Sequence, residues 1–237
     1  MAQRDRIAAT ETAFEILDEV HERGGASAAD LIEATGLSRG GVYKHLRTLG
    51  AVDALVNHDG VYELGPKFTE YGLGATDSHA VLDQTEKIDE LARTLDAPAN
   101  LWVGDGDDCR CVYTTNADRR DGYPRERGDT ERLSESPPGK AILARLPTER
   151  RSELIGTHNE DLMVQLETLR ERQLLEEELL SAPDWISIAT PVVDPSDEPV
   201  AAIEIVIPAE RASGIDVKNN IRGLLTETAN QMRVEML

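Results

Sequence analysis

The residues best suited to contacting another molecule lie in one short basic segment at positions 36–52. This segment holds three cations and no acid, although the whole chain has a formal net charge of -20. Its apolar residues Val42, Leu46 and Leu49 have the spacing of a helix that packs one face against a core. The other faces carry groups suited to phosphates and base edges, namely Ser38, Arg39, Gly40, Tyr43, Lys44 and Arg47. The pattern predicts a helix that binds nucleic acid; the alternative is a structural helix with solvated charges.

The neighbouring segments complete a small domain of helices and a hairpin. Apolar positions repeat at helical spacing over 10–23, and Ser27 and Asp30 form the capping box of a second helix. Ser38 is the expected N-cap of the basic helix, while Gly40 either allows close approach to DNA or only weakens the first turn. Two alternating segments then flank a tight turn at 58–60. This order is that of a winged helix-turn-helix, with His58 at the wing tip, where it either enters a minor groove or contacts nothing.

The remainder of the chain alternates strands and helices. A helical stretch over 68–96, interrupted by glycines, is expected to link two domains. Strands are expected at 100–103, 109–115, 185–193 and 200–207, with 116–137 as a long loop. Helices are expected from Pro138, from Thr148, over 162–180 and over 215–236. Strand pairs separated by helices make an α+β domain.

The composition bounds the class of protein. No apolar run approaches the roughly 20 residues that span a membrane, and no signal-peptide core follows Met1, so we expect a cytoplasmic protein with no membrane partner. Forty-five acids oppose 25 bases, and the acids are spread over every segment. A dispersed acidic surface with arginine preferred to lysine fits a protein that works in molar salt, where charge repulsion is screened. A halophilic host follows as an inference.

Enzymatic and metal chemistry find little support. The five histidines are scattered, with no pair at metal-binding spacing. Cys109 and Cys111 lie two residues apart, which suits neither a disulfide nor a zinc site without further ligands. We therefore interpret both as structural thiols, with redox or metal use as the alternative, and expect no catalytic residue, no metal and no cofactor.

Three motifs together resemble the IclR-type transcriptional regulators. The first is the basic helix from 37–39 with its wing and the run at 62–68, the second is 138–147, and the third is 188–194 followed by 200–203. The resemblance covers nearly the whole chain. It implies a winged helix DNA-binding domain at 1–67, a linker helix at 68–84, and an effector-binding and oligomerisation domain with a GAF-like or profilin-like sheet at 85–237. It also implies double-stranded operator DNA as a partner, a homodimer or dimer of dimers, and a small-molecule effector.

The same resemblance places effector-site residues in the C-terminal domain. They are Ser136, Gly139, Lys140, Glu177, Trp185, Ser187 and Glu204. Lys140 either attracts an anion together with free helix amides or is solvated. Glu177 either faces the effector or lies on a solvated helix face, and Trp185 is either a ligand platform or part of a core.

This chain departs from the family pattern at that site. Two prolines at 137–138 remove backbone donors, Ser187 stands at the position of a family cysteine, and Glu204 replaces a small polar residue. These departures argue against a carboxylate effector bound as in better-known members. We expect a sequence-specific DNA-binding regulator with a metabolite site in its C-terminal domain; the alternative is a winged-helix module for protein contact and assembly that binds no effector.

Overall fold

The chain forms two compact units, residues 1–78 and 79–237. A computed structural model describes residues 7–77, 80–116, 122–155 and 159–236. The division falls inside the segment expected to link two domains. Each unit has its own hydrophobic core.

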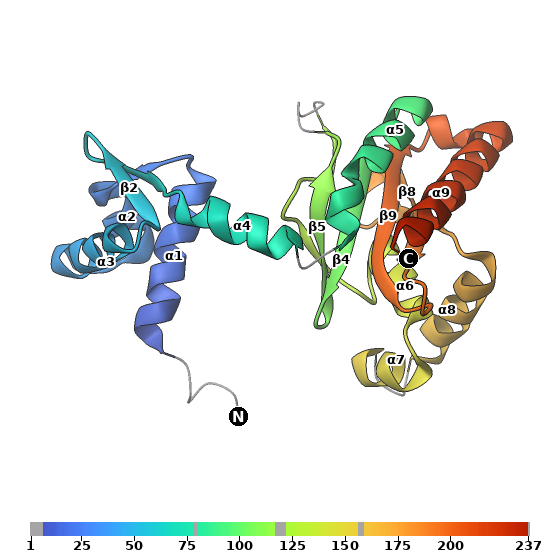
Figure 1. The fold of residues 1–237 in the computed structure, drawn as a ribbon, viewed down its shortest axis with the longest axis horizontal. Helices are drawn as coiled ribbons and strands as arrows, with labels where there is room; N and C mark the ends of the chain where they lie inside the picture. The colour runs from blue at the N-terminus through green and yellow to red at the C-terminus, as the bar shows by residue number, and fades with distance from the viewer. Residues whose placement is uncertain (1–6, 78–79, 117–121, 156–158, 237) are drawn as a thin grey trace. The chain divides into compact units, whose positions relative to one another are not determined.

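The first unit is a three-helix domain with a small sheet, followed by one further helix (Figure 1). Its elements are α1 (Ala8–Glu22), β1 (Ala26–Ser27), α2 (Ala28–Thr35), α3 (Arg39–Ala51), β2 (Leu55–His58), β3 (Val61–Leu64) and α4 (Lys67–Asp77). The three strands are antiparallel in the order β1-β3-β2. The capping box is present, because the Ser27 hydroxyl accepts from the Asp30 amide and the Asp30 carboxylate accepts from the Ser27 amide at 2.8 Å. The predicted winged helix-turn-helix is confirmed.

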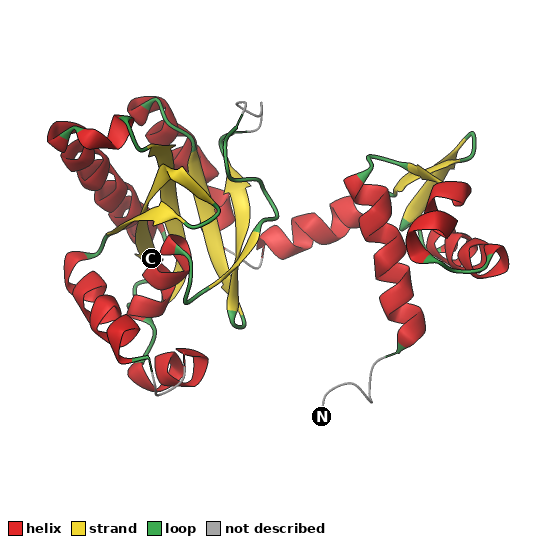
Figure 2. Ribbon diagram, turned by 180° about the vertical axis from the view of Figure 1, so that it is seen from behind, coloured by secondary structure: helices red, strands yellow, loops and turns green. Residues whose placement is uncertain are grey.

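The second unit is a six-stranded antiparallel sheet between helices (Figure 2). Its elements are η1 (Ala80–Gln84), α5 (Thr85–Leu95), β4 (Ala99–Asp105), β5 (Asp108–Thr114), β6 (Thr130–Arg132), α6 (Pro137–Arg145), α7 (Thr148–Ile155), α8 (Glu160–Arg172), β7 (Leu175–Leu179), β8 (Ala182–Val193), β9 (Pro199–Pro208), η2 (Arg211–Ser213) and α9 (Ile215–Glu235). The strand order is β6-β5-β4-β9-β8-β7. The α+β class expected for the chain is thereby confirmed.

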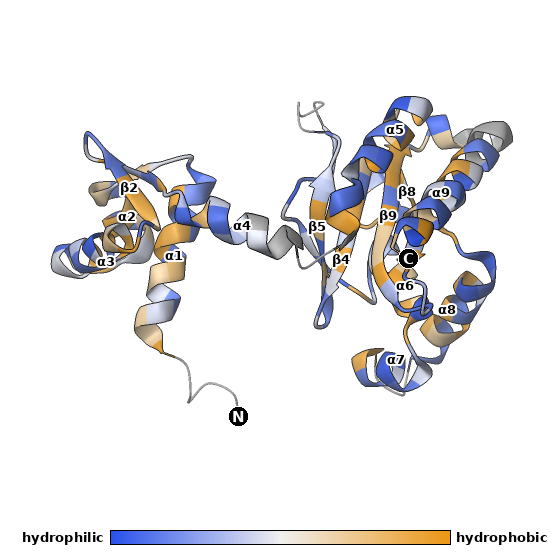
Figure 3. Cartoon of the chain, viewed as in Figure 1, coloured by the Kyte–Doolittle hydropathy of each residue, from blue (hydrophilic) through white to orange (hydrophobic). Residues whose placement is uncertain are grey.

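The sheet buries both faces, and successive residues of its central strands serve different cores. On one face Leu101 and Ile203 pack against α5 and α9. On the other face Trp102 and Ala202 pack against α6 and α8. Successive residues alternate between the two faces because a strand has a two-residue period. Since both faces are buried, β8 and β9 are almost uniformly hydrophobic, as the orange strands of Figure 3 show. A polar residue in the buried part of these strands, 187–193 of β8 or 201–207 of β9, therefore needs a partner.

Two expectations about this unit are wrong. The helix expected over 162–180 ends at Arg172, and Leu175–Leu179 forms the edge strand β7, paired with β8. Glutamate and leucine favour helices intrinsically, but pairing with the long strand β8 decides this segment. The expected loop over 116–137 also contains the short strand β6, which pairs with β5. Glu177 thus lies on a strand and not on a helix.

Candidate DNA-binding and effector sites

Helix α3 presents its polar residues to solvent and its apolar residues to the core. Val42, Leu46 and Leu49 are buried between the helices of the first unit. The residues predicted to contact DNA are all exposed: Ser38, Arg39, Gly40, Tyr43, Lys44 and Arg47. Because this segment holds three cations and no acid, the exposed face offers phosphate-binding and base-reading groups without a competing carboxylate on the helix.

The start of α3 is defined by two features of the turn that precedes it. Gly36 ends α2 in the left-handed conformation at φ 65°, which glycine adopts without strain. The Ser38 hydroxyl then accepts from the Gly41 amide at 3.2 Å, as an N-cap does. The Arg39 guanidinium lies 5.7 Å from the Tyr43 ring centroid. The two exposed side chains therefore lie beside each other near the start of α3.

The wing is a short hairpin of β2 and β3. Its turn is closed by Asn57, whose side-chain oxygen accepts from the Gly60 amide at 3.0 Å. Asp59 and Gly60 both have positive φ, as a tight hairpin turn requires. His58 is exposed at the end of β2 beside this turn. The structure therefore places His58 at the wing tip, where it was expected.

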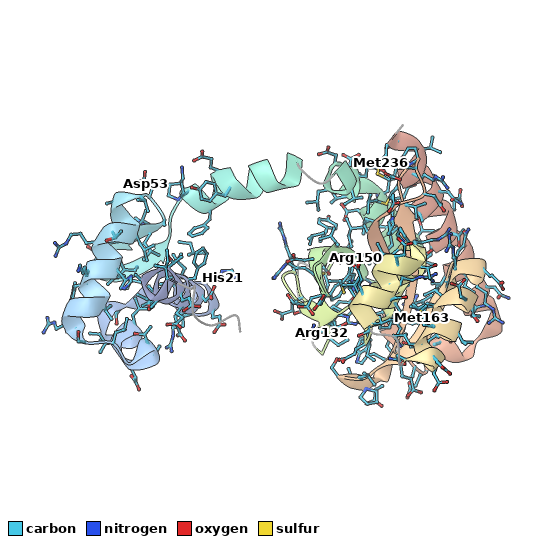
Figure 4. All side chains as sticks on the ribbon, turned by 90° about the horizontal axis from the view of Figure 1, so that it is seen from below. His21, Asp53, Arg132, Arg150, Met163 and Met236 are labelled. Carbon is cyan, nitrogen blue, oxygen red and sulfur yellow. The ribbon has the colours of Figure 1, made fainter. Side chains whose placement is uncertain are left out.

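The residues expected at the effector site divide between two places in the second unit. The first is a hollow of about 460 Å³ at the start of α6. Its lining includes the predicted residues Ser136, Lys140 and Glu177, together with Glu131 and the exposed Arg132 that is labelled in Figure 4. The Lys140 ammonium binds the Glu177 carboxylate at 2.7 Å. Lys140 is thus neither solvated nor free for an anion, because it pairs with an acid of the chain.

The α6 terminus offers no unused amide to an anion. Pro137 and Pro138 occupy its first positions and carry no N–H. The Gly139 amide donates to the Ser136 hydroxyl at 3.2 Å, and the Lys140 amide donates to the Ser136 carbonyl at 2.8 Å. Gly139 itself is a packing residue, because a Cβ there would lie 2.5 Å from the Leu133 Cα.

The second place is a buried cluster around Glu204 on the α6/α8 face of the sheet. Asn100 of β4 lies directly opposite Glu204 in register, and Ser187 belongs to the neighbouring strand β8. The Glu204 carboxylate is fully buried and accepts from the Trp102 indole at 2.8 Å and from the Ser187 hydroxyl at 2.7 Å. It also accepts from the Asn100 amide at 3.1 Å. Two predicted residues, Ser187 and Glu204, therefore meet in one network.

Arg125 provides the positive charge of this cluster. Its side chain is 2% exposed, and its Nη2 atom lies 3.0 Å from Glu204 while its Nη1 atom lies 2.6 Å from Glu131. Burial alone would lower the pKa of the Arg125 guanidinium, but the charges of Glu204 and Glu131 outweigh burial and hold that pKa above its ordinary value. Because Glu131 also lines the hollow, Arg125 connects the two places.

Trp185 lies beside this cluster, half-buried on β8. Its ring meets the Tyr123 ring edge to face, with centroids 5.8 Å apart, and the Tyr123 hydroxyl accepts from the Asn100 amide at 2.8 Å. Burial raises the pKa of Tyr123 well above its ordinary value. Tyr123 and Arg125 were not predicted, because they come from a segment with no periodic pattern. The one available signal was Glu204 itself, a lone acid in an apolar strand.

The positions of the two cysteines support their interpretation as structural thiols. Both are free and buried in the core between the sheet, α6 and α8. Burial raises the pKa of each thiol to about 12. A raised pKa disfavours the thiolate, which is the reactive form, at neutral pH.

The fold and its exposed basic helix define a two-unit protein with a helix-turn-helix DNA-binding domain and a C-terminal α/β domain. Residues 8–57 match a family described as a helix-turn-helix domain. Residues 74–234 match the family described as the C-terminal domain of the bacterial transcriptional regulator IclR. The chain belongs to the IclR family of transcriptional regulators, which carry a DNA-binding domain and an effector-binding C-terminal domain.

Individual relatives agree with this assignment. A probable HTH-type transcriptional regulator ArcR of Halobacterium salinarum is 27% identical over 251 residues, covering 98% of this chain and 94% of that protein. The crystal structure of Thermotoga maritima IclR superposes with a TM-score of 0.80 at 21% identity, covering 98% of this chain and 99% of that chain. An IclR homologue of Microbacterium hydrocarbonoxydans complexed with 4-hydroxybenzoate superposes at 0.78 with 14% identity, covering 96% and 98%. The last two likenesses establish the fold.

Membrane insertion finds no support in the described part of the chain. No helix there is both long enough and apolar enough to cross a bilayer.

Proposed function

We propose that α3 is the recognition helix and that the chain acts as a cytoplasmic homodimer on a pseudo-palindromic operator. The observation that carries this proposal is the exposed, acid-free polar face of α3, capped by Ser38. Side chains at the start of such a helix reach phosphates and base edges when it enters a major groove. The chain would act by binding and not by catalysis.

Ser38 allows the interface to be tested without disturbing the helix. In Ser38→Asp the carboxylate still caps α3, but it places a negative charge where phosphate would lie. Ser38→Ala removes the cap and adds no charge. We expect Ser38→Asp to keep the thermal stability of the first unit and lose operator binding, and Ser38→Ala to lose about 0.5–2 kcal/mol of stability and keep most binding.

The exposed cations give a second test. Arg39→Ala and Lys44→Ala should weaken binding in a gel shift against the chain's own upstream region, by about 1–3 kcal/mol for a side chain that reads a base. Arg150→Ala is the matched control, because Arg150 is exposed on α7 of the second unit. Unchanged binding in both α3 variants would refute the assignment of α3. A folded protein that forms no specific complex from low to molar KCl would favour the protein-contact module instead.

We further propose that a small metabolite binds in the hollow beside Lys140 and Glu177. The hollow's volume of about 460 Å³ lies in the range of small-molecule sites, and one IclR homologue is complexed with 4-hydroxybenzoate. Genomic footprinting would show which genes flank the bound operators, and their substrates and products are the compounds to test. A true effector should change operator affinity. Lys140→Met breaks the Lys140–Glu177 pair that lines the hollow, so it should abolish that response while operator binding without effector persists. A response unaltered in Lys140→Met would place the site elsewhere.

The charge of the chain suggests the conditions under which it works. With 45 acids against 25 bases, we propose a halophilic setting in which molar salt screens the repulsion between surface carboxylates. Sedimentation in molar KCl, with and without operator DNA, should show a dimer. A monomer at every salt concentration, even when bound to DNA, would refute the homodimer.

A further inference from the structure

The buried carboxylate of Glu204 is surrounded by donors from three separate parts of the second unit. Asn100 and Trp102 come from β4, Ser187 comes from β8, and Arg125 comes from the segment between β5 and β6. Arg125 supplies two of the contacts, from Nε at 3.3 Å and from Nη2 at 3.0 Å. Both carboxylate oxygens are engaged, Oε1 by two donors and Oε2 by three.

Such a set of donors has the chemistry of a carboxylate receptor. A guanidinium supplies charge and two N–H groups, and neutral indole, amide and hydroxyl donors satisfy the remaining lone pairs. Folding stability alone does not explain this set of donors, because replacing a buried ion pair by apolar residues often leaves the stability unchanged or raises it. Nothing in DNA binding calls for it, since the cluster lies wholly within the second unit.

We propose that this cluster is a carboxylate-binding site which the chain fills with its own Glu204 side chain. In the natural protein the internal carboxylate excludes small monocarboxylates from Arg125. Truncation of Glu204 to alanine removes one methylene and the carboxylate, which together correspond to acetate. Glu204→Ala should therefore leave a polar cavity of matching shape and donor set, and acetate should occupy it. The proposal does not depend on DNA binding or on the effector hollow.

The test is thermal unfolding of the full chain, monitored by tryptophan fluorescence. Both tryptophans, Trp102 and Trp185, belong to the second unit, so the signal reports the unit that holds the cluster. Glu204→Ala is titrated with acetate at constant total salt, with chloride and neutral acetamide as the comparison solutes. Glu198→Ala, an exposed glutamate at the turn before β9, is the matched control. Glu204→Gln keeps the side-chain volume and leaves no cavity.

Acetate should raise the Tm of Glu204→Ala in a saturable manner. At ten times its Kd, it multiplies the folding equilibrium constant about 11-fold, which corresponds to about 3–6 °C for a domain of this size. Acetamide and chloride should give no such rise, and acetate should not stabilise the natural chain, Glu198→Ala or Glu204→Gln beyond chloride.

With a folded Glu204→Ala variant, each of the remaining outcomes overturns the proposal. A folded Glu204→Ala variant that gains no more from acetate than from acetamide shows that the cluster is not a carboxylate receptor. An equal gain in the natural chain shows that Glu204 does not exclude the ligand. If Glu204→Ala is unfolded, the measurement becomes refolding with acetate against acetamide. Selective recovery with acetate supports the proposal, and recovery with both or with neither refutes it.

Discussion

Removal of Arg125 should expose how strongly the second unit depends on its buried charges. In Arg125→Met the volume and flexibility of the side chain are largely kept, while the guanidinium is lost. Glu204 then stays fully buried without a cation, and Glu131 loses its 2.6 Å partner at the edge of the hollow. The perturbation is thus electrostatic and not a cavity.

The magnitude follows from the contacts that are lost. Arg125 makes two bonds to Glu204 and one to Glu131, and a hydrogen bond to a charged group contributes about 1.5–3 kcal/mol. Asn100, Trp102 and Ser187 still donate to Glu204, so not all of this sum is lost. Breaking one side of a buried ion pair costs about 3–5 kcal/mol, and we expect Arg125→Met to fall in this range. The Tm should drop by about 6–20 °C.

The double variant Arg125→Met/Glu204→Leu gives the decisive comparison. Because it removes both charges, it should recover much of the stability lost in Arg125→Met, which is the signature of a strongly coupled pair. Urea unfolding followed by tryptophan fluorescence and far-UV circular dichroism measures all variants, with the exposed Arg150→Ala as control. A loss below about 1 kcal/mol in Arg125→Met, the value of a surface pair, would refute the reasoning. Strict additivity of the two changes would refute it as well.

The remaining predictions concern packing, thiol chemistry and salt. Gly139→Ala should destabilise the second unit by about 1–3 kcal/mol in urea unfolding, because its Cβ would lie 2.6 Å from the Leu133 carbonyl oxygen; a loss near zero would show that α6 shifts freely. Cys109 and Cys111, whose pKa burial raises to about 12, should resist a thiol reagent at about pH 8 until the chain unfolds. The pKa of each thiol is higher in the folded chain than in the unfolded chain. The free energy of unfolding should therefore be intact below about pH 9 and fall as the pH rises toward 12. This fall should shrink when both cysteines are replaced by alanine. Operator affinity should decrease less steeply with KCl than for ordinary DNA-binding proteins, because acidic surface takes up cations that DNA releases; a steep loss above low salt would contradict this.

Local patterns in the sequence were sufficient for the helices and the wing of the first unit, but they did not predict β1, which pairs with the distant strand β3. The 3.6-residue repeat of Val42, Leu46 and Leu49, the Ser27–Asp30 capping box and the turn at 58–60 each depend on neighbours within a few positions. The structure reproduces all three features. Exposure of the residues proposed to contact DNA then follows from the helical repeat, because burial of one face leaves the others free.

The second unit was less predictable wherever a residue depends on a distant partner. The run at 175–179 has helix-favouring residues, yet it is a strand because β8 offers an edge to pair with. Arg125 and Tyr123 lie in a polar segment with no repeat, and their partners are 79 and 23 residues away in the chain. An acid such as Glu204 within an apolar strand indicates that a buried partner is needed, but the sequence does not indicate which cation is that partner.

The cluster around Glu204 also determines where an irregular part of the chain lies. Residues 122–129 form no helix or strand, but Tyr123 bonds Asn100 and Arg125 bonds Glu204 at the centre of the sheet. The Gly128 amide bonds the Cys111 carbonyl at 2.8 Å, so the segment is held along its length. It leads directly into Thr130–Arg132, the strand that lines the hollow beside Lys140. A buried ion pair that adds little net stability therefore contributes in another way, because it holds in place the segment from which one wall of the hollow is built.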